Sequence, residues 1–201
     1  LDILIFRGMI KLITLAIDEN QLTYLQEGIF LDLINLKSLQ VCDNNISKLD
    51  DKLFDNSTNL KYLLLDGNNL QSLNGSIFQN LVSLEILNLS NNDISLIEKN
   101  VFKNTNELLI LILSSNNIQF INLTVSKNLT NLNTLVLSKN KLVKLDDLIF
   151  QNFSQLINLT LEKNSIDEIS CNAFQGLDEL LILNLHGNKL TSLKSPIFDP
   201  I

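Results

Sequence analysis

The chain has 201 residues and a mass of 22.7 kDa, which would ordinarily correspond to one or two globular domains. Its formal net charge of −7 and pI near 4.6 disfavour nucleic acid as a partner, because nucleic-acid binding depends on Lys and Arg neutralising phosphates. The acidity is uneven, with 7 basic and 13 acidic residues in 1–100 against 8 and 9 in 101–201, so we expect the first half to repel anionic partners more strongly.

The predicted elements repeat along the chain with a period of 24 residues. Apolar residues recur at positions 1, 4, 6, 11, 14 and 19 of each copy, and Asn occupies position 9. The alternation at positions 4 and 6 predicts a short strand, with the side chains at positions 3, 5 and 7 on the opposite, solvent-facing side. A fixed period predicts one elongated domain over 1–201 with a continuous core. After a partial copy at 1–11, copies begin at Leu12, Leu36, Leu60, Leu84, Leu108, Leu132, Leu156 and Leu180.

The Asn at position 9 recurs without a slip, at the point where the chain turns out of each predicted strand. Its amide both donates and accepts, so it can satisfy turn backbone groups that would otherwise be buried without partners. A lone Asn after a strand is usually only a turn residue, but a register this regular predicts a structural ladder. Its members are Asn20, Asn44, Asn68, Asn92, Asn116, Asn140, Asn164 and Asn188.

A Phe at position 19 is expected to close the far wall of each copy and to stack on its neighbours as a spine. Ser126 replaces this Phe in the fifth copy, and we expect Leu123 or Val125 to fill part of the gap, at a local cost in packing. The phenylalanines are Phe6, Phe30, Phe54, Phe78, Phe102, Phe150, Phe174 and Phe198.

The pattern LxxLxLxxNxLxxLxxxxFxxLxx resembles the 24-residue typical class of the leucine-rich repeat superfamily, and residues 60–83 match every motif position. The resemblance covers essentially the whole chain. It implies an α/β solenoid, a right-handed horseshoe with parallel strands on the concave face and irregular or short 3-10 segments on the convex face. Within the superfamily, the chain is similar to animal extracellular proteins of the Toll-like receptor, chaoptin, Slit and matrix proteoglycan types.

The two ends lack the polar caps that solenoids need and the cysteine clusters seen in extracellular relatives, so we expect a fragment of a longer chain. No leader and no transmembrane stretch is visible, so any membrane contact is expected through segments outside these residues. Cys42 and Cys171 lie more than five copies apart and cannot form a disulfide with each other. Two free thiols argue mildly against an oxidising compartment.

Glycosylation sequons argue in the other direction. The chain has eight, about twice the number that its Asn, Ser and Thr content would give by chance, and this favours a secreted or cell-surface protein. Asn88 and Asn158 fall on the predicted concave face, where glycans would cover part of the sheet. The six in outward loops, which we predict as glycosylation sites, are Asn45, Asn56, Asn74, Asn122, Asn128 and Asn152.

The sequence indicates no active site, metal site or cofactor. His186 is predicted on the exposed face with no partner, and the acidic pairs 50–51 and 146–147 are four copies apart, in solvated loops. Metal sites need convergent ligands, and no such cluster is predicted. We therefore expect a binding protein and not an enzyme.

The concave face of the middle copies concentrates exposed apolar residues that the core does not require. An apolar patch with a polar rim is a common mark of a protein-binding surface, although β-branched residues also suit strands wherever they point. The predicted ligand-binding residues are Tyr62, Leu64, Asp66, Ile86, Ser90, Ile110, Ile112, Thr134 and Val136.

These patterns predict an extracellular recognition module of a Toll-like or adhesion-type receptor, which binds a protein or microbial ligand or a co-receptor. A matrix protein of the proteoglycan type, whose solenoid can form a homodimer, is one alternative. An intracellular adaptor is another, and its sequons would remain unmodified.

Overall fold

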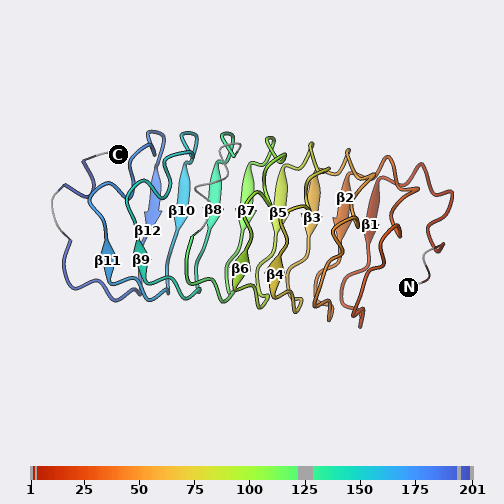
Figure 1. Cartoon of the computed structure of the whole chain (residues 1–201), viewed down its shortest axis with the longest axis horizontal. Helices are drawn as coiled ribbons and strands as arrows, with labels where there is room; N and C mark the ends of the chain where they lie inside the picture. Colours follow the sequence, from red (N-terminus) through yellow and green to blue (C-terminus); the bar gives the residue numbers. More distant parts are fainter. Residues whose placement is uncertain (1, 3, 122–128, 194–195, 200–201) are drawn as a thin grey trace.

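The computed structural model describes residues 2, 4–121, 129–193 and 196–199. Figure 1 shows an elongated solenoid in which one parallel sheet of 8 strands runs from the N-terminal to the C-terminal end. Strands pair in register with the strand 24 residues further on, as in the pairing of Ile86 with Ile110. This is the right-handed leucine-rich-repeat horseshoe that the sequence predicts. Its parallel strands are β1 Thr14–Ala16, β2 Ser38–Gln40, β3 Tyr62–Leu64, β5 Ile86–Asn88, β7 Ile110–Ile112, β8 Thr134–Val136, β10 Asn158–Thr160 and β12 Ile182–Asn184.

The strands are short because each occupies only positions 3–5 of its copy, where the middle residue points into the core. That residue is Leu in every copy, and Leu63, Leu87 and Leu111 are fully buried. The parallel ladder extends beyond the strands, since the N–H at position 8 donates to the carbonyl at position 7 of the next copy. In the middle copies this bond joins Asn91 N–H to Ser114 O at 2.9 Å. The backbone of the sheet is therefore hydrogen-bonded over most of each strand segment and the turn that follows.

Position 8 lies in the left-handed region in all eight copies, with φ between 49° and 69°. Only Gly67 and Gly187 are glycines at this position, and the other copies place Glu, Asp, Asn, Ser or Lys there. A left-handed residue turns the chain away from the strand direction at the end of the strand. The turn that carries position 9 into the interior is thus set by backbone geometry that most copies adopt with a side chain present.

The convex side consists of turns closed by i→i+3 backbone hydrogen bonds, such as Leu33 N–H to Phe30 O at 3.0 Å, and the described residues contain no helix. Two small parallel sheets lie along the lower edge of Figure 1. They pair β4 Ser72–Leu73 with β6 Leu96–Ile97, and β9 Lys144–Leu145 with β11 Glu168–Ile169.

The phenylalanine spine forms two stacked runs with ring centroids 6.0–6.3 Å apart. The first run joins Phe6 to Phe102 and the second joins Phe150 to Phe198. Phe153 packs against Phe150 at 6.3 Å, at the start of the second run. The expectation that Leu123 or Val125 fills the gap at Ser126 lies outside the described residues.

No helix in the described part of the chain is long and apolar enough to cross a membrane.

Candidate functional site: the concave face of the sheet

The Asn ladder holds the backbone from which the concave side chains project. In the fifth copy, the Asn116 amide donates to Leu89 O at 2.9 Å, Leu113 O at 3.1 Å and Ser114 O at 3.3 Å. Its Oδ1 accepts the Ile94 N–H at 2.9 Å. One side chain thus satisfies backbone groups of its own turn and of the preceding copy, which ties consecutive copies together.

The same arrangement recurs along the solenoid. The six inner members of the ladder are between 4% and 8% exposed. Asn20 is exposed and donates only within its own turn, to Ile17 O and Asp18 O. Asn188 is half-buried and still bonds to the preceding copy through Leu161 O at 3.0 Å. The six inner members are Asn44, Asn68, Asn92, Asn116, Asn140 and Asn164.

The predicted binding residues of the middle copies form two neighbouring rows on the sheet face. The strand register places Ile86 beside Ile110, and Ile112 beside Val136. Tyr62 is 38% exposed, whereas the other apolar members of the rows are half-buried, so their side chains pack sideways on one another and still reach solvent. The first row is Tyr62, Ile86, Ile110 and Thr134, and the second is Leu64, Asn88, Ile112 and Val136.

Asn88 interrupts the second row and organises a small polar network. Its Nδ2 donates to Asp66 Oδ1 at 2.9 Å. Its Oδ1 accepts the N–H of Ser90 at 3.0 Å and the Ser90 hydroxyl at 2.8 Å. The carboxylate of Asp66 is half-buried and therefore held in place on the face.

Ser90 does not lie where the sequence analysis expects it. It is only 8% exposed, because its hydroxyl turns back to the amide of Asn88 instead of facing solvent. Ser138, at the same position of its copy, is 7% exposed. The expectation that position 7 faces solvent is thus wrong for these serines, and Ser90 offers no free group to a ligand.

A thiol lies between two carboxylates on the N-terminal part of the face. The N–H of Cys42 donates to Asp18 Oδ1 at 2.7 Å, and its Sγ donates to Asp66 Oδ1 at 3.0 Å. The pKa of the Cys42 thiol is raised well above its usual value. Burial is the largest cause, and the hydrogen bond to Asp66 is the second. Cys42 is therefore a neutral hydrogen-bond donor near neutral pH, and both cysteines are free thiols.

The C-terminal part of the face carries polar groups at positions 5 and 7, while the apolar Ile182 at position 3 of β12 is 52% exposed. Glu162 accepts the Asn184 amide at 2.8 Å, and the Asn184 Oδ1 accepts the N–H of His186. On β10, the buried Asn158 Oδ1 and Thr160 Oγ1 have no hydrogen-bond partner. The apolar patch is thus bounded by polar side chains toward both ends of the sheet.

The charge of this face has one sign. At positions 3, 5 and 7 of the eight copies, the sequence places no Lys or Arg and three carboxylates, Asp18, Asp66 and Glu162. Lys and Arg are the residues that neutralise phosphates, and these positions carry neither.

The sequons differ in how well their amides are exposed. Asn45 and Asn56 are both exposed, and the Asn56 amide donates to Leu31 O at 3.2 Å. Asn74 donates to Asp51 Oδ1 at 3.1 Å, and Asn152 is half-buried. Asn88 and Asn158 lie within the strands of the sheet. Asn122 and Asn128 lie outside the described residues.

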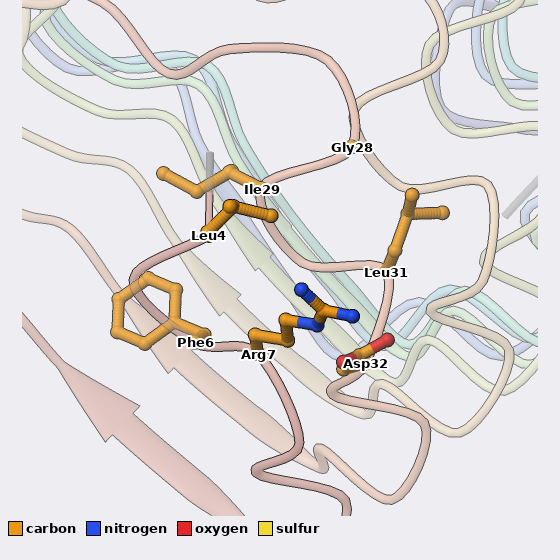
Figure 2. Close-up of a pocket in the computed structure, with 7 residues that line it drawn as sticks. All are labelled: Leu4, Phe6, Arg7, Gly28, Ile29, Leu31 and Asp32. Carbon is orange, nitrogen blue, oxygen red and sulfur yellow. The ribbon is translucent and has the colours of Figure 1, made fainter. Parts of the chain in front are cut away.

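Figure 2 shows a hollow that the sequence analysis did not identify, at the N-terminal end of the solenoid. It lies between the first two turns, where Arg7 points toward Asp32. Asp32 Oδ2 accepts the N–H of Gly8 at 2.7 Å. The hollow shares no residue with the concave face. It is lined by Leu4, Phe6, Arg7, Gly28, Ile29, Leu31 and Asp32.

Catalytic and metal chemistry find little support in the geometry. Among the described residues, no three His, Cys, Asp or Glu side chains are grouped so that they could hold a metal ion. His186 is exposed. The site offers shape, apolar surface and hydrogen-bonding groups for recognition.

Comparisons with known proteins agree with the repeat and the fold. The sequence matches the family described as Leucine rich repeat over residues 34–94, 83–142 and 130–190. A search of curated proteins finds no match. The chain is similar to the crystal structure of a TLR13–ssRNA13 complex, with 28% identity and a TM-score of 0.90 over 96% of this chain and 28% of that chain.

A second similar structure is the octameric complex of Latrophilin 3, Unc5D and FLRT2, in which FLRT2 is the leucine-rich repeat component. The identity is 27% and the TM-score 0.83, over 94% of this chain and 58% of that chain. The chain therefore spans less than two thirds of either protein. Since the matched family segments run from residue 34 to 190, the chain belongs to the leucine-rich repeat family.

Proposed function

We propose that the chain is an extracellular recognition module, part of a Toll-like or adhesion-type receptor ectodomain, that binds a protein or microbial ligand on its concave face. The observation that carries the proposal is the half-exposed apolar patch over β3, β5, β7 and β8, on a sheet that the Asn ladder holds rigid. Such a preformed surface binds with little change of shape.

The patch has the composition of a protein-binding centre. An aromatic residue, Tyr62, and the aliphatic side chains of Ile86, Ile110 and Ile112 can be desolvated together, while Asp66 supplies an oriented acceptor at their edge. Both similar structures support recognition, one in a complex with RNA and one in a complex with proteins.

Between these two kinds of partner, the charges favour protein. The concave positions carry the carboxylates of Asp18, Asp66 and Glu162 and no cation, so a phosphate backbone would find no neutralising group on this face and would be repelled near its two ends. We infer a ligand whose contact surface is apolar at its centre and neutral or basic at its rim.

A direct test starts from a screen, since the ligand is unidentified. The purified chain is presented as a multivalent probe to an array of extracellular ectodomains and microbial surface proteins, with single-stranded RNA as a separate arm. Each binder is then measured against the variant Ile110→Lys/Ile112→Lys. The matched control is Val82→Lys, because Val82 is 47% exposed and lies outside the strands.

We expect the double variant to reduce affinity by a factor of at least about 100, since two charges would be buried at the contact, while its circular dichroism spectrum stays unchanged. Val82→Lys should leave affinity within about twofold. Binders that tolerate Ile110→Lys/Ile112→Lys, or RNA as the tightest binder, would contradict the proposal.

The compartment is tested separately by expression in glycosylating cells. We expect a glycan on Asn45, because its amide is exposed, and a loss of that mass shift in Asn45→Gln. A secreted chain without any glycan would favour the intracellular adaptor.

A further inference from the structure

The loops that follow the strands carry a charge pattern that the concave face does not explain. We call these loops the post-strand flank and define it by positions 8, 10, 12 and 13 of each copy. It runs along the lower edge of Figure 1, where β4, β6, β9 and β11 are labelled. At positions 8 and 10, the first four copies place only acidic charges, Glu19, Asp43 and Asp93, and the last four place only basic charges, Lys139, Lys141, Lys163 and Lys189.

These seven charged residues are all exposed. None of them takes part in the salt bridges found among the described residues. The backbone of Lys139 and Lys163 is held by hydrogen bonds, because their N–H groups donate to Glu162 O and His186 O at 2.8 Å. The flank therefore carries negative charge in its N-terminal half and positive charge in its C-terminal half, and neither is neutralised by these salt bridges.

The middle of the same flank is apolar. Leu96, Phe120 and Val143 are 54%, 78% and 45% exposed, on the fourth, fifth and sixth copies. Phe120 lies between the two small sheets, after β6 and before β9. When a partner covers a phenyl ring this exposed, the removal of apolar surface from water favours the association.

Three residues on the flank depart from the pattern without reversing it. Lys48 lies in the acidic half, at position 13 of its copy, and Asp167 lies in the basic half, at position 12 of its copy. Glu168 forms a salt bridge with Lys144 at 3.0 Å, so these two charges cancel within the basic half.

We propose that two copies of this chain associate antiparallel through the post-strand flank, about a two-fold axis between the fourth and fifth copies. This axis places Asp43 of one copy opposite Lys163 of the other, and Glu19 opposite Lys189. It brings the two Phe120 side chains close to the centre. A two-fold interface uses the same patch twice, so it requires a surface that is complementary to itself when reversed. The flank has this property at its ends and its apolar middle, whereas Lys139 and Lys141 would face the uncharged Gly67 and Asn69 of the other copy, and Asp93 its Ser115 and Asn117.

A second copy is the partner that explains all three features together. A polyanion would match the lysines but be repelled by the acidic half, and an acidic protein would leave Glu19 and Asp43 unpaired. The inference goes beyond the proposed function and uses none of the concave residues.

The association should be weak. Eight strands span about 34 Å at 4.8 Å spacing, and a strip this long but only a few side chains wide falls below the roughly 800 Å² per partner of a standard interface. Its charges are exposed and therefore screened by salt. The inference concerns the chain without a glycan on Asn45, because Asn45 lies on the acidic half at position 10 and the glycan expected there would hold two copies apart. The test protein and all its variants therefore carry Asn45→Gln.

Sedimentation velocity over a range of protein concentrations provides the first test. We expect reversible dimers at low salt and a dissociation constant at least about tenfold weaker in 0.5 M salt, where the Debye length is about 4 Å. A chain that stays monomeric at millimolar concentration and low salt, or that dimerises independently of salt, overturns the proposal.

Charge reversal gives the sharper test. One variant carries Lys139→Glu, Lys163→Glu and Lys189→Glu, and another carries Glu19→Lys, Asp43→Lys and Asp93→Lys. Each alone should fail to dimerise, because its flank has a single sign, whereas an equimolar mixture should form the mixed dimer. Failure of the mixture, with both variants folded by circular dichroism, overturns the antiparallel arrangement.

Phe120→Asp should weaken dimerisation at least tenfold at either salt concentration. Val82→Asp serves as the control, because Val82 is also exposed but lies outside the flank. Dimers that survive Phe120→Asp but disappear with Ile110→Lys/Ile112→Lys would place the interface on the concave face and overturn the proposal.

Discussion

The buried ladder and the concave face lie within the same copies but differ in what determines their residues. Asn116 and Ile112 are only four positions apart, yet the Asn116 side chain bonds to four backbone groups of two copies, while the apolar Ile112 side chain makes no hydrogen bond. The backbone hydrogen bonds require an amide side chain at position 9, whereas position 5 is occupied by many different side chains. Residues fixed by the fold and residues available for recognition can therefore be separated by position within the copy.

The largest effect is expected from Asn116→Ala. It would leave Ile94 N–H without a partner in the core and remove the amide bonds to Leu89 O and Leu113 O, which keep only their bonds from Asn92 and Asn140. Since one buried unsatisfied group costs about 1–3 kcal/mol and each further hydrogen bond lost costs about 1 kcal/mol, we expect a loss of about 3–5 kcal/mol in the free energy of unfolding. Urea denaturation measures it. Asn20→Ala, at the exposed member of the ladder, should cost less than about 1 kcal/mol, and equal losses would contradict the role of the inter-copy bonds.

Two adjacent residues on β7 compare the interior with the face directly. Leu111 is fully buried, so Leu111→Ala should cost about 2–5 kcal/mol through lost burial and the cavity left behind. Ile112 is half-buried on the concave face, and Ile112→Ala should cost about 1 kcal/mol. The two unfolding curves provide the measurement, and a larger loss at Ile112 would mean that the face belongs to the core.

The two thiols extend the comparison to chemical reactivity. Cys171 is exposed, whereas the Cys42 thiol is half-buried and donates to Asp66. The raised pKa of Cys42 keeps its reactive thiolate scarce, so iodoacetamide at pH 8 should alkylate Cys171 at least about tenfold faster. Peptide mass spectrometry over time distinguishes the sites. Asp66→Asn should speed labelling of Cys42, and an unchanged rate would remove Asp66 from the explanation.

The same shift has a consequence for stability. A folded-state pKa above the unfolded value of about 8.5 means that the unfolded chain releases the thiol proton first as pH rises. The contribution of Cys42 is therefore complete below about pH 8.5 and is lost at higher pH. The Tm should fall more between pH 8 and 10 for the natural chain than for Cys42→Ser. Parallel curves would show that the thiol does not contribute.

The smallest effect is expected at the left-handed turn. Ser115 has a φ of 54°, a conformation that suits Gly better than Ser. Ser115→Gly should stabilise the chain by about 0.5 kcal/mol, after the greater freedom of Gly in the unfolded state is subtracted. Ser114→Gly is the matched control, since Ser114 has no positive φ, and it should destabilise.

The sequence was sufficient to predict the 24-residue unit, the strand at its start and the face on which Ile110 and Ile112 lie, because a repeated pattern averages out local ambiguity. It could not predict that Asn116 bonds to Leu89 of the preceding copy. That partner depends on how tightly two turns stack, which spacing alone does not contain.

Two features of the surface could not be predicted from the repeat pattern either. Ser90 was expected on the exposed face, and only the conformation of the Asn88 amide, which draws the hydroxyl inward, shows that it is buried. The positive charge of the post-strand flank does not show in the net charge of the second chain half, because loop acids such as Asp146 and Asp147 offset Lys139 and Lys163 there.

The inter-copy amide bonds have a consequence for how such a chain can change its length. Each inner Asn needs a carbonyl 27 residues earlier and an N–H 22 residues earlier, as Asn92 does with Leu65 and Leu70. Duplicating or deleting one full 24-residue block keeps both distances, whereas inserting a single residue between a strand and the inner Asn that follows it moves that amide away from both partners. Engineered or natural variants should therefore grow and shrink by whole turns, with smaller insertions tolerated only on the convex loops beyond the reach of these bonds.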